Sequence, residues 1–202
     1  MNKKTYLILG GLIGVIVLIV AYQLYVTHKA ALPYEATTPQ TVANTELSFS
    51  FSYPKGSDAF TLLEPNGTDK GIIKSYIMMP SAAYEGYKSS GGDAPAAMNV
   101  FVFNLQGKNA TSSETNSRIT ELQNWAADNS TLSSIKQAKT TPDVVALDGI
   151  KTLHYQADGL YQQDIYLVSY KGYVYMFVGQ YDKQTDSTYT AFQDLIKTIS
   201  FN

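Results

Sequence analysis

The chain opens with one long apolar run and continues as a longer region of short alternating segments. Between Tyr6 and Val26 the only strongly polar side chain is Gln23, and no residue there carries a charge. As a helix this run is about 31 Å long, close to the hydrocarbon thickness of a bilayer. We therefore expect residues 1–28 to form a short cytoplasmic tip and a transmembrane anchor that contacts the lipid bilayer through Tyr6–Val26.

The charges that flank this run predict its orientation. Lys3 and Lys4 precede it, whereas only His28 and Lys29 follow it closely. The positive-inside rule then keeps the N-terminus in the cytoplasm and places the C-terminal domain outside the cell membrane. A cleaved signal peptide is the alternative, but it needs a shorter apolar run and small residues at the cleavage site. We expect an uncleaved, single-pass signal anchor.

Two glycines in the anchor have a spacing that favours contact between helices. Gly10 and Gly14 form a G-x-x-x-G pair, which lets two membrane helices approach closely. This spacing predicts a weak homodimer of anchors. Glycine is also common in membrane helices, so a monomeric anchor with incidental glycines is the alternative.

The anchor is followed by a predicted stalk and then by one folded domain. Residues 29–45 contain two prolines and four threonines with little apolar periodicity, which is typical of an extended segment. The domain is expected over residues 46–202. Its first strand is marked by alternation, with apolar side chains at Leu47, Phe49, Phe51 and Tyr53 and serines between them.

Further elements follow from the same pattern. Strands are predicted at residues 60–64, 71–79, 97–105, 150–157, 160–170 and 173–181. The segment 97–105 is apolar on both faces, which indicates a central strand. Residues 81–95 contain three glycines and are predicted to be a long loop.

Two segments have the apolar stripe of a helix. Residues 117–128 carry one that includes Trp125, so we expect this ring in the core rather than at a ligand site. Residues 186–198 carry another, and Asp186 is placed to cap that helix. Locally paired strands with two separate helices predict an α+β fold with a mainly antiparallel sheet.

The order of these elements resembles a known family. A Phe51-Ser-Tyr-Pro strand comes first, a turn at Gly149 leads into paired strands, and a closing helix ends in Ile199-Ser-Phe201. This order resembles the PsbP-like (Mog1/PsbP/DcrB-like) domains over about residues 46–202. The resemblance implies an α/β/α sandwich and a non-catalytic accessory or binding role. The sequence departs from that family where Lys55-Gly-Ser-Asp follows the Tyr-Pro, since the family often has a tryptophan there.

Candidate chemistry in the domain is sparse. The chain has no cysteine, which excludes disulfides, thiol catalysis and cysteine-ligated metals. His154 is the one histidine of the domain, and alternation places it on a polar strand face with Thr152 and Gln156, where we expect it to be solvated. No metal or cofactor site is therefore predicted. The chain also lacks a G-x-S-x-G motif, so we expect no enzyme, and a cell-envelope hydrolase without a recognisable motif is the alternative.

Charge narrows the choice of partner. Three of the 15 lysine and arginine residues precede residue 30, which leaves 12 against 17 acidic residues in the remainder. Arg118 is the only arginine. Nucleic acid is not expected as a partner, because phosphate backbones are bound by clusters of lysine and arginine. An envelope protein, an envelope polymer or a small ligand remains as the expected partner.

A group of aromatic residues on two neighbouring strands is a candidate binding surface. If Lys171-Gly172 forms a two-residue hairpin turn, Tyr170 pairs with Tyr173 and Val168 pairs with Tyr175. One sheet face then carries five aromatic residues, here called the aromatic face: Tyr166, Tyr170, Tyr173, Tyr175 and Phe177. Such a face either lies under a helix or loop, or it serves as a docking surface. The resemblance implies that both sheet faces are covered and so favours burial, and any exposed remainder is the best binding candidate in the chain. We expect at least its hairpin end to stay accessible for binding.

Overall fold

The computed structural model describes residues 38–55, 59–65, 71–105 and 119–202. All of them belong to one compact unit, Ala36–Asn202. The expected anchor Tyr6–Val26, with Gly10 and Gly14, lies outside the described residues. In the part of the chain that the structure describes, no helix is long and apolar enough to cross a membrane.

The strands form two sheets in which every pairing is antiparallel. The small sheet has the order β1-β2-β10 and consists of β1 (Pro39–Asn44), β2 (Phe49–Pro54) and β10 (Ser200–Phe201). The large sheet has the order β3-β4-β5-β9-β8-β7-β6. Its strands are β3 (Phe60–Leu63), β4 (Ile72–Pro80), β5 (Met98–Asn104), β6 (Asp143–Leu147), β7 (Ile150–Asp158), β8 (Gln162–Tyr170) and β9 (Tyr173–Tyr181). The antiparallel α+β fold predicted from the sequence is confirmed.

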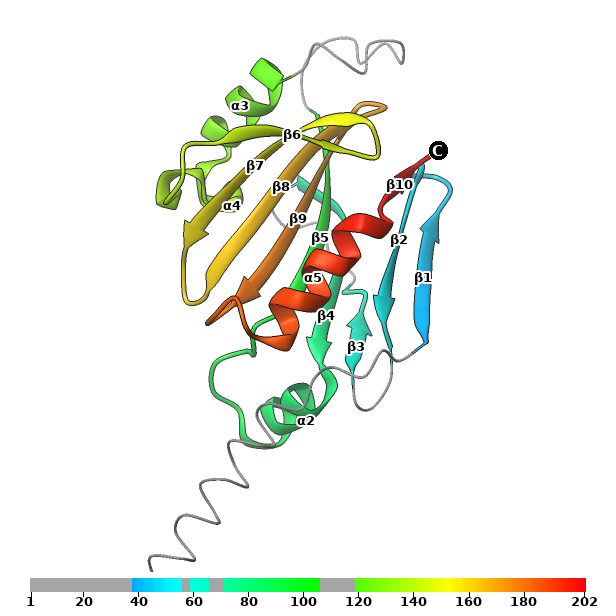
Figure 1. The fold of residues 1–202 in the computed structure, drawn as a ribbon, viewed down its shortest axis with the longest axis vertical. Helices are drawn as coiled ribbons and strands as arrows, with labels where there is room; N and C mark the ends of the chain where they lie inside the picture. Colours follow the sequence, from blue (N-terminus) through cyan, green and yellow to red (C-terminus); the bar gives the residue numbers. More distant parts are fainter. Residues whose placement is uncertain (1–37, 56–58, 66–70, 106–118) are drawn as a thin grey trace, which may run out of the picture. The chain divides into compact units, whose positions relative to one another are not determined.

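One face of the large sheet is covered by α3 (Ile119–Asp128), which packs on β7 and β8 (Figure 1). Leu122, Trp125 and Ala126 of this helix are buried against apolar side chains of the central strands. The ring of Trp125 lies 5.0 Å from that of Phe103 on β5, measured between ring centroids. The predicted core position of Trp125 is therefore confirmed. As its two-sided apolar pattern indicated, β5 is an interior strand, paired with β4 on one side and β9 on the other.

The opposite face is covered by α5 (Ser187–Thr198) together with β2 of the small sheet (Figure 1). The helix approaches the sheet closely because Gly179 of β9 has no side chain. A Cβ atom at residue 179 would lie 2.3 Å from the ring of Phe192. The rings of Phe49, Phe51 and Tyr76 pack against one another at centroid distances of 5.5–6.0 Å and join the two sheets. Helices thus lie on both faces of the large sheet, as the resemblance implied.

Two expectations about domain organisation are corrected. The stretch 29–45 was expected to be a stalk, but β1 lies within it and pairs with β2 along its whole length. The folded domain therefore begins before residue 46. Residues 81–95 were expected to be a loop, but Ser81–Ser90 form the helix α2. Its only buried residue is Ser81, so the helix has no apolar stripe that the sequence pattern would reveal.

Several short elements were also missed. They are the edge strand β6, the terminal strand β10, the single turn α4 (Ser130–Ser133) and the 3₁₀ turn η2 (Ile135–Gln137). Each spans five residues or fewer, which is too short to display a hydrophobic period. Asp186 precedes α5 as predicted, but its side chain accepts the backbone N–H groups of Asp182 and Lys183 instead of capping the helix.

Candidate functional site

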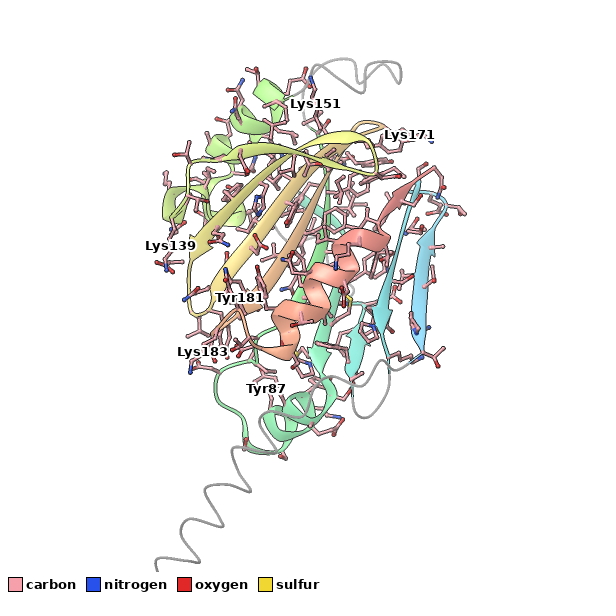
Figure 2. The ribbon with its side chains drawn as sticks, in the orientation of Figure 1. Tyr87, Lys139, Lys151, Lys171, Tyr181 and Lys183 are labelled. Carbon is pink, nitrogen blue, oxygen red and sulfur yellow. The ribbon has the colours of Figure 1, made fainter. Side chains whose placement is uncertain are left out.

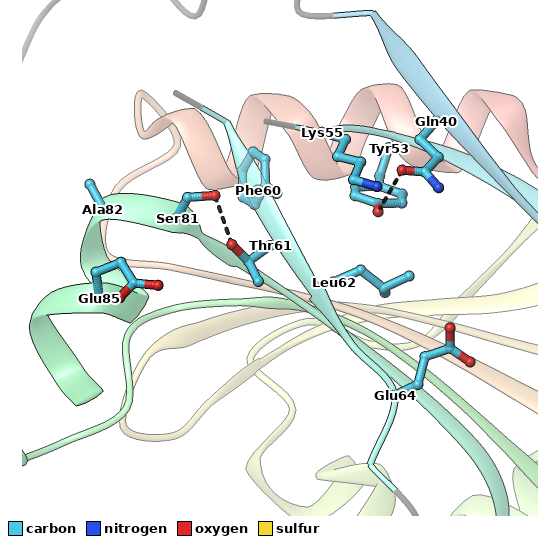
Figure 3. A pocket seen from close by; sticks show the side chains of 10 residues that line it. All are labelled: Gln40, Tyr53, Lys55, Phe60, Thr61, Leu62, Glu64, Ser81, Ala82 and Glu85. Atoms are coloured by element: carbon cyan, nitrogen blue, oxygen red, sulfur yellow. Dashed lines mark hydrogen bonds between the residues drawn. The ribbon is translucent and has the colours of Figure 1, made fainter. Parts of the chain in front are cut away.

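An open pocket of about 660 Å³ lies where β2, β3 and the first turn of α2 meet (Figure 3). Its volume is within the range of small-molecule sites in proteins. The lining residues are Gln40, Tyr53, Lys55, Phe60, Thr61, Leu62, Glu64, Ser81, Ala82 and Glu85. The small sheet supplies one wall and the edge of the large sheet supplies the other, so the pocket exists only because the two sheets meet here.

Local structure brings these residues together. Gln40 of β1 is the pairing partner of Tyr53 on β2. An isolated β-bridge pairs Lys55, which follows β2, with Phe60, the first residue of β3. At the end of β4, the N–H of Ser81 donates to the carbonyl oxygen of Ala59 at 3.0 Å. The hydroxyl groups of Thr61 and Ser81 lie 2.9 Å apart and share a hydrogen bond across the floor of the pocket.

One side of the pocket is a basic corner formed by Gln40, Tyr53 and Lys55 (Figure 3). The hydroxyl of Tyr53 donates to Oε1 of Gln40 at 3.4 Å. Burial, and secondarily the nearby carboxylate of Glu64, raise the pKa of Tyr53 above its ordinary value. Lys55 is exposed and makes no ion pair with any described residue.

The two carboxylates of the pocket already have cationic partners outside the lining. Glu64 lies 2.7 Å from Nζ of Lys74, and Glu85 lies 2.6 Å from Nζ of Lys88. Both pairs are partly exposed, so each stabilises the fold little. They matter for the charge of the pocket. The lysine partners offset the negative charges of Glu64 and Glu85, whereas no described carboxylate offsets the positive charge of Lys55.

The strongest polar cluster of the described residues surrounds His154, away from the pocket. Its Nδ1 lies 3.0 Å from Asp143 and its Nε2 lies 2.7 Å from Asp164. Its ring stacks on Tyr166 at a centroid distance of 4.4 Å. The hydrogen bond to Asp164 and the charges of both carboxylates raise the pKa of His154 despite its partial burial. The expectation of a solvated histidine is therefore wrong, because β6 and β8 each bring a carboxylate to this strand.

This histidine cluster is tied to α5. The side chain of Gln193 donates to Oδ2 of Asp164 at 2.7 Å, and Asp164 is 2% exposed. Neither ring nitrogen of His154 contacts a serine or threonine hydroxyl among the described residues. No group of three metal-ligating side chains occurs in the described part of the chain. The arrangement is that of a structural link between the sheet and α5.

The register predicted for the aromatic face is confirmed. Tyr170 pairs with Tyr173, Val168 with Tyr175 and Tyr166 with Phe177. However, Tyr175 and Phe177 are completely buried, so the proposal that these two residues bind a partner is corrected. The ring of Tyr175 lies 5.1 Å from that of Phe49, and its hydroxyl donates to the carbonyl oxygen of Leu47. The small sheet thus covers Tyr175, and the burial of both residues agrees with the covering that the family resemblance favoured.

The other three aromatic residues are half-buried. Tyr166 lies between His154 and Phe192 of α5, at a centroid distance of 6.0 Å from the latter. Burial, reinforced by the charge of Asp164, raises the pKa of Tyr166 to about 12. Tyr170 donates to the carbonyl oxygen of Asn202 at 3.1 Å, so the hairpin end is partly covered by the C-terminal strand.

The pocket residues were not singled out from the sequence. Gln40 lies in the stretch read as a stalk, and Ser81, Ala82 and Glu85 lie in the stretch read as a loop. A signal for the helix was present, because Glu85 and Lys88 have the spacing of an ion pair on one helix face. No comparable signal indicated that β1 would join a sheet.

Comparison with known proteins identifies the fold. No family model matches this chain, and no curated protein matches its sequence. The chain is similar to the solution structure of cyanobacterial PsbP (CyanoP) from Synechocystis sp. PCC 6803, with a TM-score of 0.52 and 12% sequence identity over 85% of this chain and 97% of that chain. It also matches a crystal structure from Bacteroides thetaiotaomicron, with a TM-score of 0.41 and 11% identity over 83% of this chain and 49% of that chain.

The likeness to cyanobacterial PsbP defines the class of the described unit. It is a sheet-rich α+β protein with antiparallel sheets, and its fold is PsbP-like. At 12% identity the likeness to CyanoP extends to the fold alone.

Proposed function

We propose that this chain is a single-pass membrane protein that displays a non-catalytic, PsbP-like binding domain outside the cytoplasmic membrane. The uncharged run Tyr6–Val26 and the preceding Lys3 and Lys4 support the anchor and its orientation. The domain recruits an envelope component, and the pocket between the sheets is its ligand site. Gly10 and Gly14 add weak self-association of the anchors.

The observation that carries this proposal is the composition of the pocket. Its lining combines apolar side chains, a tyrosine and charged groups, as ligand sites do. The one imidazole of the domain, that of His154, is not part of this lining and is held by two carboxylates elsewhere. A hydroxyl nucleophile in the pocket therefore has no neighbouring histidine base, which supports binding rather than catalysis.

The absence of cysteine allows a direct test of topology. Asn2→Cys and Ser89→Cys would each introduce a single thiol, at the expected cytoplasmic tip and at an exposed position of α2. In spheroplasts of an expressing bacterium, a membrane-impermeant maleimide should label the Ser89→Cys chain. The Asn2→Cys chain should react only after the membrane is permeabilised. The reverse pattern, or a chain that fractionates as a shortened soluble form, would exclude the proposed anchor.

A further inference from the structure

We propose that the pocket binds small organic anions that carry an apolar body. This inference deepens the proposed function and rests on it, because that function places the ligand in this pocket. The acidic group of the ligand lies at the basic corner, next to Lys55. Its apolar part lies along Leu62 and Ala82, which line the same pocket (Figure 3).

The first argument is the balance of charge around the pocket. Glu64 and Glu85 are each within 2.7 Å of a lysine, so their charges are locally compensated. Lys55 lines the same pocket and has no such partner among the described residues. The uncompensated charge of the described lining is therefore positive, even though the chain as a whole is acidic. A ligand anion would supply the missing partner.

The second argument is the supply of hydrogen-bond donors at the same place. The hydroxyl of Tyr53 donates to Oε1 of Gln40. The amide nitrogen of Gln40 is consequently left as a donor toward other groups. The first turn of α2 also lines the pocket, and it has neither an acidic residue nor a side-chain cap. The partial positive charge of a helix N-terminus adds to the preference for an anion.

The third argument concerns the rest of the ligand. Leu62 is half-buried and Ala82 is exposed, and both line the pocket. The cavity of about 660 Å³ has room for more than a single inorganic ion. An inorganic anion would leave this apolar surface in contact with water, whereas an organic anion would cover it.

Three probes of equal shape and different charge test this inference. They are a fluorophenyl-propanoate, the ammonium counterpart and the alcohol counterpart, each below its aggregation limit. Binding is measured by ligand-observed fluorine NMR on the full chain in lipid nanodiscs, with empty nanodiscs as the blank. We expect the carboxylate to bind and the other two probes to bind at least about tenfold more weakly, as loss of a charge-assisted hydrogen bond implies.

Variants locate the binding. Lys55→Met should weaken the carboxylate about tenfold and Lys55→Arg should restore it, because arginine keeps the charge. Lys151→Met is the matched control, since Lys151 is exposed, lies on β7 and does not line the pocket (Figure 2). Ala82→Trp places an indole ring on the α2 side of the lining, and we expect it to weaken binding of every probe. Thermal unfolding of each variant confirms that it remains folded.

The outcomes separate the two proposals. If the alcohol or the ammonium binds as well as the carboxylate and Ala82→Trp weakens that binding, the anion preference is wrong while the pocket remains the ligand site. Equal carboxylate binding by the Lys55→Met chain also overturns the role of Lys55. If no probe binds, or if Ala82→Trp changes nothing, both the anion preference and the pocket as ligand site fail.

Discussion

The Nε2 atom of His154 lies 2.7 Å from Oδ1 of Asp164, and the second oxygen of that carboxylate accepts a hydrogen bond from Gln193 of α5. One buried carboxylate thus links β7, β8 and the helix that covers them. Replacing His154 would leave the buried carboxylate of Asp164 without its cationic partner, which is costly. This link therefore contributes to the docking of α5 on the sheet.

The stability contributed by His154 should depend on pH. Its hydrogen bond to Asp164 raises its pKa in the folded protein above the usual value of 6.5. Stability from the protonated ring is then fully present below about pH 6.5 and is lost as the pH rises through the raised value. Asp143, Asp164 and Tyr166 are the titratable groups that face the ring.

The measurement compares the unfolding free energy of wild type and His154→Gln across pH in the compact unit, residues 36–202. At low pH we expect the substitution to cost about 1–3 kcal/mol, as for a hydrogen bond to a charged group. The cost should shrink as the pH rises past the folded pKa. A difference that stays constant from acidic to alkaline pH would contradict the role assigned to the protonated ring.

The folded unit should require β1. Residues 39–44 pair with β2, and the side chain of Asn44 donates to the hydroxyl of Tyr76 at 3.1 Å and accepts the N–H of Leu47 at 2.9 Å. A fragment of residues 46–202 should therefore be less stable than one of residues 36–202 by at least about 2 kcal/mol, since several hydrogen bonds are lost. Chemical unfolding of both fragments measures this. Equal stability of the two fragments would show that residues 36–45 are not part of the folded domain.

Trp125 should be a structural residue. It is 9% exposed and packs on Phe103, so Trp125→Ala should cost about 3–5 kcal/mol of unfolding free energy. Leu160→Ala is the control, because Leu160 is 70% exposed and its loss should change stability by no more than about 0.5 kcal/mol. A cost below about 1 kcal/mol for Trp125→Ala would place the ring outside the core.

Gly179 should be required by the close approach of α5. Because a Cβ atom there would meet the ring of Phe192, Gly179→Ala should destabilise the fold by about 1–3 kcal/mol. A smaller residue at position 192 relieves the collision, so Phe192→Leu should cost less in the Gly179→Ala background than in wild type. A double-mutant cycle measures this coupling. Strictly additive costs would show that the two residues do not constrain each other.

The sequence predicted those parts of the fold that its periodicity could reveal. The strand Tyr173–Tyr181 was predicted with its observed bounds, and the register across the hairpin was correct. The reason is local, because Lys171 and Gly172 both adopt positive φ values, 47° and 83°, in a two-residue turn that sets the pairing of the two strands. Trp125 was placed correctly for a similar reason, since a helical stripe reports burial directly.

The candidate site could not be predicted in this way. The pocket depends on β1 joining the small sheet and on α2, a helix that buries only Ser81. His154 acquired its two carboxylates from β6 and β8, and β6 was not recognised as a strand. Tyr175 and Phe177 share the predicted face, but the contact of Tyr175 with Phe49 of the small sheet is long-range, and no local pattern reveals it.

The central claim is that the pocket between the sheets holds a ligand. Native mass spectrometry of the full chain, purified from the organism that makes it, tests this most directly. Wild type should retain a small molecule that matches no added lipid or detergent, and the Ala82→Trp chain, whose pocket is narrowed by an indole ring, should retain much less of it. An unliganded wild type, or a ligand retained equally by the Ala82→Trp chain, would contradict the claim.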